Sequence, residues 1–295
     1  MYPEDYRSCQ LCPRACGVDR TAGKLGACHT AAEALVAHSM LHRWEEPCIS
    51  GERGSGAVFF SGCPLGCVYC QNRKISLGGV GTPYTPTELA SLFLSLEEQG
   101  AHNVNLVTAT HVVPHVALAI EKARAGGLKI PIVYNTSGYE SERTLAALHG
   151  LVDIYLTDLR YGRAKTARAY SGAADYPEVA ERALCRMVEQ TGPLLFDEKG
   201  LLQRGTVVRL LLLPSHLIEA KSILVRLYRT YGEKVMYSLM RQYTPMTESK
   251  EFPALTRRVT AFEYMSFLDA ARALGIRNAY AQSAESASES FIPDF

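Results

Sequence analysis

The sequence lacks the features that would place the protein in a membrane, outside the cell or on nucleic acid. No apolar run approaches the roughly 20 residues that a helix needs to cross a bilayer. Lys and Arg number 31 and Asp and Glu 30, so there is no sign of the basic face that nucleic-acid binding requires. Residues 1–6 are polar and acidic, unlike a secretory signal. We therefore expect a cytoplasmic protein that binds neither a membrane nor a nucleic acid.

A dinucleotide fingerprint and a disulfide framework are also missing. Gly51, Gly54 and Gly56 precede a predicted strand, whereas a dinucleotide loop follows one, so they indicate a turn into that strand. Nine cysteines, an odd number at metal-like spacings, fit a reducing compartment better than a set of disulfides. Cys48 and Cys185 stand apart from the others, and we expect both to be buried core thiols.

Three of the remaining cysteines form a compact motif. Cys63, Cys67 and Cys70 follow the spacing C-x3-C-x2-C, with Gly62 and Gly66 allowing tight turns around a bulky group. Iron–sulfur cubanes commonly take four thiolates, so three ligands would leave one iron open. A zinc site or plain buried thiols are the alternatives. Zinc sites usually contain two C-x2-C pairs, so the spacing favours a cluster.

Four more cysteines occupy the N-terminal stretch. Cys9, Cys12, Cys16 and Cys28 are spaced x2, x3 and x11 among glycines and prolines, where few apolar residues are available for a core. Such a stretch needs a metal or a cluster to fold stably. Zinc held by four thiolates, a second iron–sulfur cluster and a metal-free segment all remain open. We assign residues 1–55 to this cysteine-rich segment and residues 56–295 to a second domain.

From residue 57 onward, apolar strand-like runs alternate with helix-like stretches. Near-continuous apolar runs are typical of parallel strands buried on both faces, and six or seven such β–α units predict an α/β fold with a full or partial (β/α) barrel. The predicted strands are 57–61, 103–109, 130–135, 152–158, 206–213, 235–240 and 278–282. The predicted helices are 30–40, 87–99, 114–125, 141–149, 177–190, 217–231 and 259–274, with an inserted hairpin or loop at 192–205.

The predicted strands end in polar residues, which should share the rim where barrels carry their chemistry. These rim candidates are Thr108, Thr110, His111, Asn135, Thr136, Asp158 and Arg160. His111 is equally well interpreted as an ordinary surface histidine, and Asp158 with Arg160 as a rim ion pair of little energetic weight. On the fifth strand, Arg209 is either a charge inside the barrel or a strand-edge residue.

The cysteine motif, with Tyr69 before its last cysteine, resembles the radical S-adenosylmethionine (SAM) superfamily. The flanking Phe60-Ser61-Gly62-Cys63 and Cys70-Gln71-Asn72 are similar to homologues of pyruvate formate-lyase activating enzyme, and the N-terminal cysteines resemble a segment of one subgroup of them. The resemblance covers about residues 57–295. It implies a partial (β/α)6-type TIM barrel and a [4Fe–4S] cluster on the three cysteines, whose open iron SAM chelates through its amino and carboxylate groups.

The resemblance also implies reductive SAM cleavage to a 5′-deoxyadenosyl radical that abstracts hydrogen. The implied cofactor-binding residues are Tyr69, Gln71, Thr108, Thr110, His111, Asn135, Thr136, Asp158 and Arg160. Two departures limit this transfer of roles. The run from Thr108 to His111 replaces the usual Gly-Gly-Glu-like turn that holds the SAM amino group. Asn135 stands where relatives carry Asp, which leaves a monovalent-cation site in doubt.

The implied substrate is a backbone glycine of a partner glycyl-radical enzyme, with an electron donor such as flavodoxin or ferredoxin as a second partner. Radical modification of a small molecule, a peptide or a cofactor precursor is the alternative within the same chemistry. An iron–sulfur electron carrier or a zinc-binding interaction protein would be a different class. That class explains the clustered cysteines, but not why a long run of β–α units ends in polar turns around them.

Overall fold

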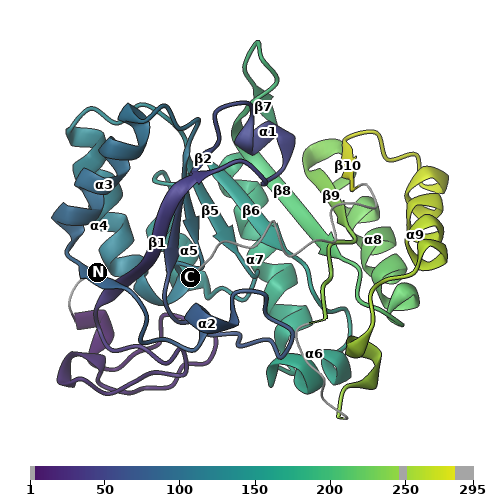
Figure 1. Ribbon diagram of the computed structural model, residues 1–295, viewed down its shortest axis with the longest axis horizontal. Helices are drawn as coiled ribbons and strands as arrows, with labels where there is room; N and C mark the ends of the chain where they lie inside the picture. Colours follow the sequence, from purple (N-terminus) through teal and green to yellow (C-terminus); the bar gives the residue numbers. More distant parts are fainter. Residues whose placement is uncertain (1–3, 246–250, 283–295) are drawn as a thin grey trace.

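The computed structural model describes residues 4–245 and 251–282 and contains a ten-stranded sheet in the order β10-β9-β8-β6-β5-β4-β2-β1-β3, with β7 paired to β8. Neighbouring strands from β2 to β10 are parallel. These strands are β2 Ser55–Phe60, β4 Val104–Val107, β5 Ile132–Thr136, β6 Ile154–Asp158, β8 Leu202–Leu211, β9 Met236–Met240 and β10 Ala279–Ala281. The sheet curves into the partial barrel that the sequence predicts (Figure 1).

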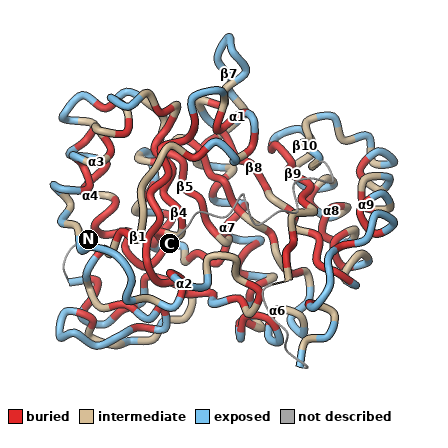
Figure 2. Tube along the Cα trace, in the orientation of Figure 1, coloured by how far each residue is buried: buried red, intermediate tan, exposed pale blue. Residues whose placement is uncertain are grey.

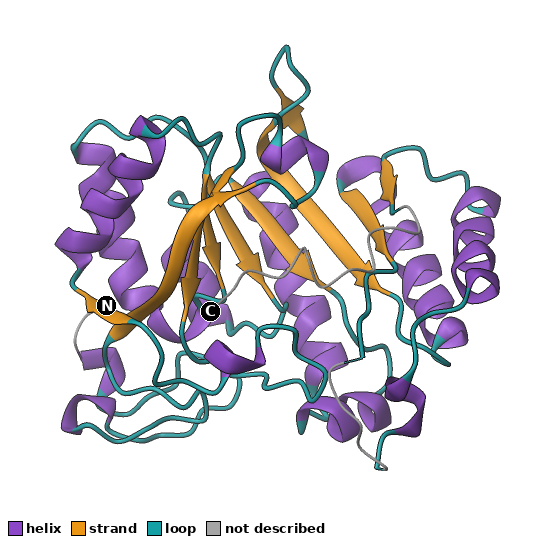
Figure 3. Ribbon diagram, viewed as in Figure 1, coloured by secondary structure: helices purple, strands orange, loops and turns teal. Residues whose placement is uncertain are grey.

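Helices follow the parallel strands in turn and cover the outer face of the sheet (Figure 3). They are α3 Pro86–Glu98, α4 Val113–Ala125, α5 Glu142–Leu148, α6 Ala164–Ser171, α7 Tyr176–Thr191, α8 Leu217–Tyr231 and α9 Ala261–Ala273. All six helices predicted beyond residue 57 are confirmed, whereas the short α6 had no prediction. Among the described residues, no helix has both the length and the apolar character to cross a membrane.

Side chains along each parallel strand point alternately toward the helices outside and into the barrel. On β5, Tyr134 packs in the outer core with residues of α3 and α4, while Val133 belongs to an inner cluster that also contains Leu156 of β6. Both faces of these strands are therefore buried, as the red interior of Figure 2 shows. This explains why their sequences are nearly continuous in apolar residues.

The prediction of a helix over 30–40 is wrong, because the chain there forms the strand β1 (Ala34–His42). β1 runs antiparallel to β2, with Met40 opposite Ala57 and His42 opposite Ser55, and also pairs with β3 (Thr82–Tyr84). Pairing with β2 and β3 decides this segment, although Thr30 and Glu33 have the spacing of a capping box that favours a helix. β1 lies in the same sheet as the barrel, although it precedes the predicted domain boundary at residue 55.

After β1 the chain crosses the N-terminal end of the barrel as the short helix α1 (Pro47–Ser50). Cys48 and Ile49 pack there against inward residues of the parallel strands, and the Asn103 side chain donates a hydrogen bond of 2.8 Å to the Ile49 carbonyl. Figure 1 shows α1 at one end of the sheet and the N-terminal segment at the other, where the strand arrows point. The barrel is thus closed at the end away from the predicted cysteine motif.

Two local predictions have opposite outcomes. The insertion at 192–205 is a hairpin in which β7 (Leu195–Phe196) pairs antiparallel with the start of β8. Cys185 is exposed rather than buried, which corrects the expectation of a core thiol. The buried face of α7 contains Ala183, Leu184 and Met187, and Cys185 lies one residue beyond Leu184, turned about 100° away from that face.

Candidate active site

A cavity of about 600 Å³ lies inside the barrel. The residues that line it come from both ends of the strands and include the three motif cysteines. Besides Cys63, Cys67 and Cys70, they include Glu45, Glu46, Tyr69, Gln71, Thr108, Asn135, Thr136, Asp158, Arg160, Arg209 and Ser238. The sequence predicts ten of these residues as cofactor or cluster ligands, and the structure brings all ten to one cavity.

The cysteine motif forms the loop that leaves the C-terminal end of β2. Cys67 accepts hydrogen bonds at its Sγ from Ser171 Oγ at 3.1 Å and from Tyr161 Oη at 3.6 Å. Burial, with a smaller contribution from the neighbouring Cys70 and Cys67, raises the pKa of Cys63 to about 12. Three thiols held this close in a buried site would be stabilised as thiolates by a positively charged iron core.

The backbone of this loop has no room for side chains at its entry. Gly62 has φ +91°, and a Cβ there would lie 2.6 Å from the Cys28 carbonyl oxygen. The next residue, Cys63, donates its backbone N–H to the same carbonyl at 3.2 Å. From the other side, Arg14 donates to the Pro64 carbonyl at 2.9 Å. The N-terminal segment therefore shapes the loop that carries the motif.

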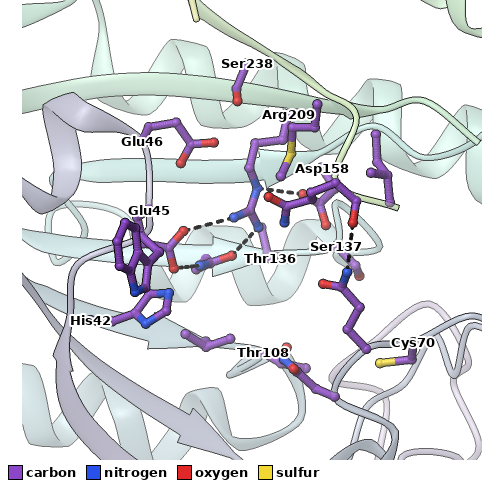
Figure 4. A pocket seen from close by; sticks show the side chains of 18 of the residues that line it. His42, Glu45, Glu46, Cys70, Thr108, Thr136, Ser137, Asp158, Arg209 and Ser238 are labelled. Atoms are coloured by element: carbon purple, nitrogen blue, oxygen red, sulfur yellow. Dashed lines mark hydrogen bonds and ion pairs between the residues drawn. The ribbon is translucent and has the colours of Figure 1, made fainter. Parts of the chain in front are cut away.

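A network of charges lies deeper in the barrel and is centred on Arg209. Its guanidinium contacts Asp158 Oδ1 at 2.7 Å, Glu45 Oε2 at 3.2 Å and Asn135 Oδ1 at 2.6 Å (Figure 4). Asn135 and Asn105 in turn donate to Glu45 Oε1 at 3.1 Å and 3.0 Å. Arg209 is thus a charge inside the barrel, which settles the two interpretations left open by the sequence.

The pKa shifts of the network follow from burial and from Arg209. Burial by itself would raise the pKa of Asp158, but the guanidinium groups of Arg209 and Arg160 outweigh it and hold that pKa below its usual range. Burial raises the pKa of Glu45 despite Arg209, and raises the pKa of Glu46 as well, with Glu45 adding to the effect. Asp158 is accordingly the most firmly ionised of the three carboxyl groups.

Arg160 presents part of its guanidinium to the cavity. Nη2 donates to Asp158 Oδ2 at 2.5 Å, while the buried Nε has no hydrogen-bond partner in the described part of the chain. A buried donor without an acceptor is costly, so its presence on a cavity wall points to an anionic ligand group. A carboxylate, such as that of SAM, matches the planar fork of Arg160.

Tyr69 and Gln71 frame the side of the cavity next to the motif. The Tyr69 ring makes edge contacts with Tyr161, Tyr170 and Tyr243 at centroid distances of 6.1–6.3 Å. It therefore belongs both to the core and to the cavity wall. Gln71 Nε2 donates to the Gln242 carbonyl at 3.2 Å, which ties the motif to the loop after β9.

Three predicted site residues follow β4, and only one of them lines the cavity. Thr108 lines the cavity with φ +61°, a conformation that a β-branched residue rarely adopts and that is often found at functional sites. Thr110 and His111 lie in a 3-10 turn behind it and do not line the cavity. Thr110 donates to Glu140 Oε1 at 2.6 Å, an acceptor that Thr136 shares.

His111 is not the surface residue of one interpretation, because only 1% of it is exposed. Its Nε2 lies 2.7 Å from the Ser61 carbonyl oxygen, and burial, with Arg20 nearby, lowers its pKa to about 3. His111 is thus a neutral donor that supports the turn before Cys63. The structure places it behind the motif rather than in contact with the cavity.

The four N-terminal cysteines gather beside this turn. Cys9, Cys12 and Cys28 are buried, and Cys16 is partly exposed. The Sγ atoms of Cys28 and Cys16 lie 3.3 Å and 3.5 Å from a Cβ built on Gly26. Burial raises the pKa of Cys12 to about 12, and the Arg14 backbone N–H opposes this while Cys28 and Cys9 add to it. These four thiols therefore form a second cysteine group.

Within residues 4–245 and 251–282, no three or more His, Cys, Asp or Glu side chains converge closely enough to hold one metal ion. The zinc interpretation of the N-terminal cysteines therefore gains no support. Each thiolate of a cubane binds a different iron, so cluster ligands lie further apart than the ligands of a single ion. The motif meets the other requirements for a cluster: one buried and two partly buried thiols, a glycine-lined entry and a shared cavity.

The sequence analysis missed Glu45 and Glu46, which reach the cavity from the connection between β1 and α1. They lie outside the predicted barrel, in residues 1–55, which the sequence assigns to the cysteine-rich segment. Asn105 and Ser238 were missed, and the role of Arg209 was left open. Alternation could have placed all three inside the barrel, because their neighbours along each strand are apolar and face the helices. Parallel pairing places Arg209 between Asp158 and Ser238.

Comparisons with known proteins agree with this geometry. The model of the radical SAM superfamily matches residues 57–190. The chain is 27% identical over 273 residues to an uncharacterized protein of Methanocaldococcus jannaschii, which covers 90% of this chain and 75% of that protein. A radical SAM methyltransferase from Sphaerobacter thermophilus has a similar structure, with a TM-score of 0.54 and 18% identity.

The structural match covers 77% of this chain and 66% of the methyltransferase, so the chain spans slightly less than two thirds of that protein. At this identity the likeness shows the fold alone. The superfamily match is more specific, because its residues include all three motif cysteines and the strands β2 to β6. Over residues 57–190, just under half of the chain, the protein is therefore similar to the radical SAM superfamily.

Proposed function

We propose that the protein is a radical SAM enzyme in which Cys63, Cys67 and Cys70 hold a [4Fe–4S] cluster and the cavity holds SAM and a substrate. When bound and reduced, the cluster would supply the electron that cleaves SAM to methionine and the 5′-deoxyadenosyl radical, which abstracts hydrogen from the substrate. The opening of all three cysteines onto a closed-ended, charged cavity is the observation that supports this most directly.

The residues of the chain would bind, orient and shield the reactants. Arg160 would receive the SAM carboxylate at its unpartnered Nε, and Asp158 and Tyr176 hold Arg160 in place through its Nη2 and its backbone N–H. Tyr69 would offer a ring to the adenine. α1 closes the far end of the barrel and limits the access of water to a reactive intermediate.

The experiment that tests this function is anaerobic reconstitution followed by dithionite and SAM. The Cys67→Ala variant removes one cluster ligand, whereas Cys185→Ala removes an exposed thiol on α7 and serves as the matched control. We expect 5′-deoxyadenosine from the parent and the control and at least a hundredfold less from Cys67→Ala, because an incomplete ligand set does not hold the cluster. Intact SAM in a well-reconstituted parent would contradict the proposal.

The substrate has two candidate classes. A backbone glycine of a partner enzyme would give a glycine-centred radical, detectable by electron paramagnetic resonance after incubation with candidate glycyl-radical enzymes. Silence with several such enzymes would favour a small molecule, a peptide or a cofactor precursor. The structural neighbour is a methyltransferase, and its activity is a further candidate within the second class.

We further infer that the N-terminal cysteine group holds a second iron–sulfur cluster and that a flavodoxin or ferredoxin supplies electrons. The hydrogen bond from Cys63 N–H to the Cys28 carbonyl supports this, because it joins the two cysteine groups directly. Two cubanes contain about eight irons and one contains about four. Iron analysis should therefore show a Cys12→Ala variant with about half the iron of the parent, and equal iron contents would contradict a second cluster.

A further inference from the structure

Glu46 is a buried carboxylate on the cavity wall that lacks a partner for one oxygen. It lies between β1 and α1, and only 7% of the residue is exposed. Its Oε2 has no hydrogen-bond partner among residues 4–245 and 251–282, while Ser238 of β9 lies beside the carboxyl group. A buried acceptor without a donor costs free energy, so its place on a cavity wall points to a missing donor.

The neighbouring cations do not supply that donor. Arg209 is the nearest, and its hydrogen bonds go to Asp158, Glu45 and Asn135. The Arg160 guanidinium is paired with Asp158. The buried part of the wall thus carries three carboxyl groups and two guanidinium groups, which leaves one carboxylate in excess (Arg43, also on the wall, is exposed).

The position of Glu46 separates it from the region expected to hold SAM. Figure 4 shows Glu46 beside Ser238 at one end of the cavity and Cys70 at the opposite end. Glu46 precedes α1, which closes the N-terminal end of the barrel, whereas the cysteine motif leaves the C-terminal end of β2. A ligand group at Glu46 therefore belongs to a molecule other than SAM.

An aromatic side chain accompanies the carboxylate. Trp44, two residues earlier, also lines the cavity, and 63% of it is exposed. A carboxylate and an indole ring on the wall of one cavity suit ammonium and guanidinium groups, because the carboxylate accepts charge-assisted hydrogen bonds and the ring can add a cation–π contact. Burial raises the pKa of Glu46, so its ionised form needs a positive charge nearby; a neutral hydroxyl would satisfy Oε2 without supplying that charge, whereas a bound cation would supply it.

We propose that Glu46 is a specificity-determining residue that binds an ammonium or guanidinium group of the substrate. This inference rests on the proposed radical SAM function for the identity of the site, and it names the substrate class. The substrate is then an amine or a guanidine, free or as the side chain of a peptide, with its cationic group held at the α1 end of the cavity. A bare backbone glycine carries no such group, so the inference favours modification of a small molecule or peptide.

The test measures binding of three small probes to the anaerobically reconstituted full-length protein by isothermal titration calorimetry. Methylguanidinium and methylammonium carry the proposed charge, and N-methylurea is a neutral analogue of methylguanidinium with a similar shape. We expect at least one cation to bind at least tenfold more tightly than N-methylurea. The tighter of the two cations identifies the group that the substrate carries.

Glu46→Gln removes the charge at nearly constant volume and should weaken binding of that cation at least tenfold. Glu52→Gln, which neutralises an exposed glutamate just after α1, is the matched control and should leave binding within twofold of the parent. Equal binding by Glu46→Gln and the parent would overturn the inference, as would equal binding of cation and N-methylurea or no cation binding by the parent. The comparison of probes uses the parent alone, so it decides the matter even if Glu46→Gln fails to fold.

SAM cleavage by the parent is measured in the same preparation and bears on the proposed function separately. Cleavage without selective cation binding overturns only the substrate class. Selective cation binding without cleavage overturns the radical SAM function and leaves Glu46 as a cation-binding residue. The two proposals therefore fail on different readouts.

Discussion

Arg209 balances the carboxylates inside the barrel. It reaches Asp158 from a neighbouring position on the sheet and Glu45 from the connection after β1, and its side chain is only 14% exposed. Removing the charge of Arg209 would leave these two carboxylates facing each other in a poorly solvated space. The network is therefore a structural requirement of the cavity as well as part of its wall.

Arg209→Met should lower the free energy of unfolding by about 3–5 kcal/mol, because breaking a buried ion pair leaves an uncompensated charge. Urea denaturation under anaerobic conditions measures this. Arg186→Met breaks the exposed pair with Glu189 on α7 and should change the free energy of unfolding by less than about 0.5 kcal/mol. Equal effects of the two substitutions would show that the Arg209 network does not stabilise the fold.

Because His111 is buried and neutral, we expect the stability of the protein to depend on pH. Its pKa is lowered to about 3 in the folded protein, against about 6.5 in an unfolded chain. Above pH 6.5 both states are neutral at this position. As the pH falls from 6.5 toward 3, only the unfolded state gains a proton, so the free energy of unfolding decreases by about 1.4 kcal/mol per pH unit.

A His111→Gln variant keeps a side-chain donor but does not titrate. Between pH 6 and pH 5, the free energy of unfolding of the variant should therefore fall less steeply than that of the parent. The two slopes should differ by about 1.4 kcal/mol per pH unit. Urea titrations across this range give both slopes. Parallel slopes would mean that the native histidine becomes protonated as readily as the unfolded one.

At the scale of elements, α3 begins with a complete capping box. Thr85 Oγ1 accepts from the Glu88 backbone N–H at 3.3 Å, and Glu88 Oε2 accepts from the Thr85 backbone N–H at 2.8 Å. Thr85→Ala should therefore lower the free energy of unfolding by about 1 kcal/mol. Thr87→Ala, at an exposed position in the same turn, should change it by less than about 0.5 kcal/mol in chemical denaturation. If Thr85→Ala lowered the free energy of unfolding as little as Thr87→Ala, the capping box would not stabilise α3.

The strands that the sequence predicts correctly are those whose apolar pattern reflects burial on both faces. The parallel strands are buried by helices outside and by the cavity wall inside, so they are apolar throughout. β1 differs because it covers the barrel as an antiparallel strand with many half-buried positions. Its preference depends on β2 being present, and the local pattern of residues 30–40 does not contain that information.

The sequence predicted site residues only where they lie at the ends of predicted strands. Asn135, Thr136, Asp158 and Arg160 lie at strand ends, so parallel topology alone brings them together. Glu45 and Glu46 enter the cavity because β1 reverses across the barrel and α1 closes its end, which is a property of the tertiary fold. His111 could be placed near the motif from the sequence, but its contact with the Ser61 carbonyl behind the motif is a tertiary one that the local sequence does not indicate.

At the scale of the whole molecule, Arg14 joins the N-terminal segment to two parts of the barrel. Its guanidinium donates to the Pro64 and Leu65 carbonyls of the motif loop and to the Ser171 and Gly172 carbonyls at the end of α6. Hydrogen bonds to a charged group each contribute about 1.5–3 kcal/mol when well formed. Without them, the loop between Cys63 and Cys67 would be held by fewer contacts.

We expect Arg14→Ala to fold but to lose iron from the reconstituted protein several-fold faster when challenged with a chelator. Absorbance of the cluster over time measures the loss, and Arg7→Ala, at an exposed position of the same segment, is the control. Retention equal to that of the control would mean that the motif loop keeps its shape without the N-terminal segment.

The short edge strands of the sheet limit aggregation, which is a common hazard of open barrels. A partial barrel has two free edges, and each could pair with another molecule and begin aggregation. Here the outermost strands are β3 and β10, with three residues each, and β3 contains Pro83, which has no N–H to donate. The long strand β2 is covered by β1 instead of ending the sheet. The barrel can therefore stay open to a substrate while offering little template for self-association between copies.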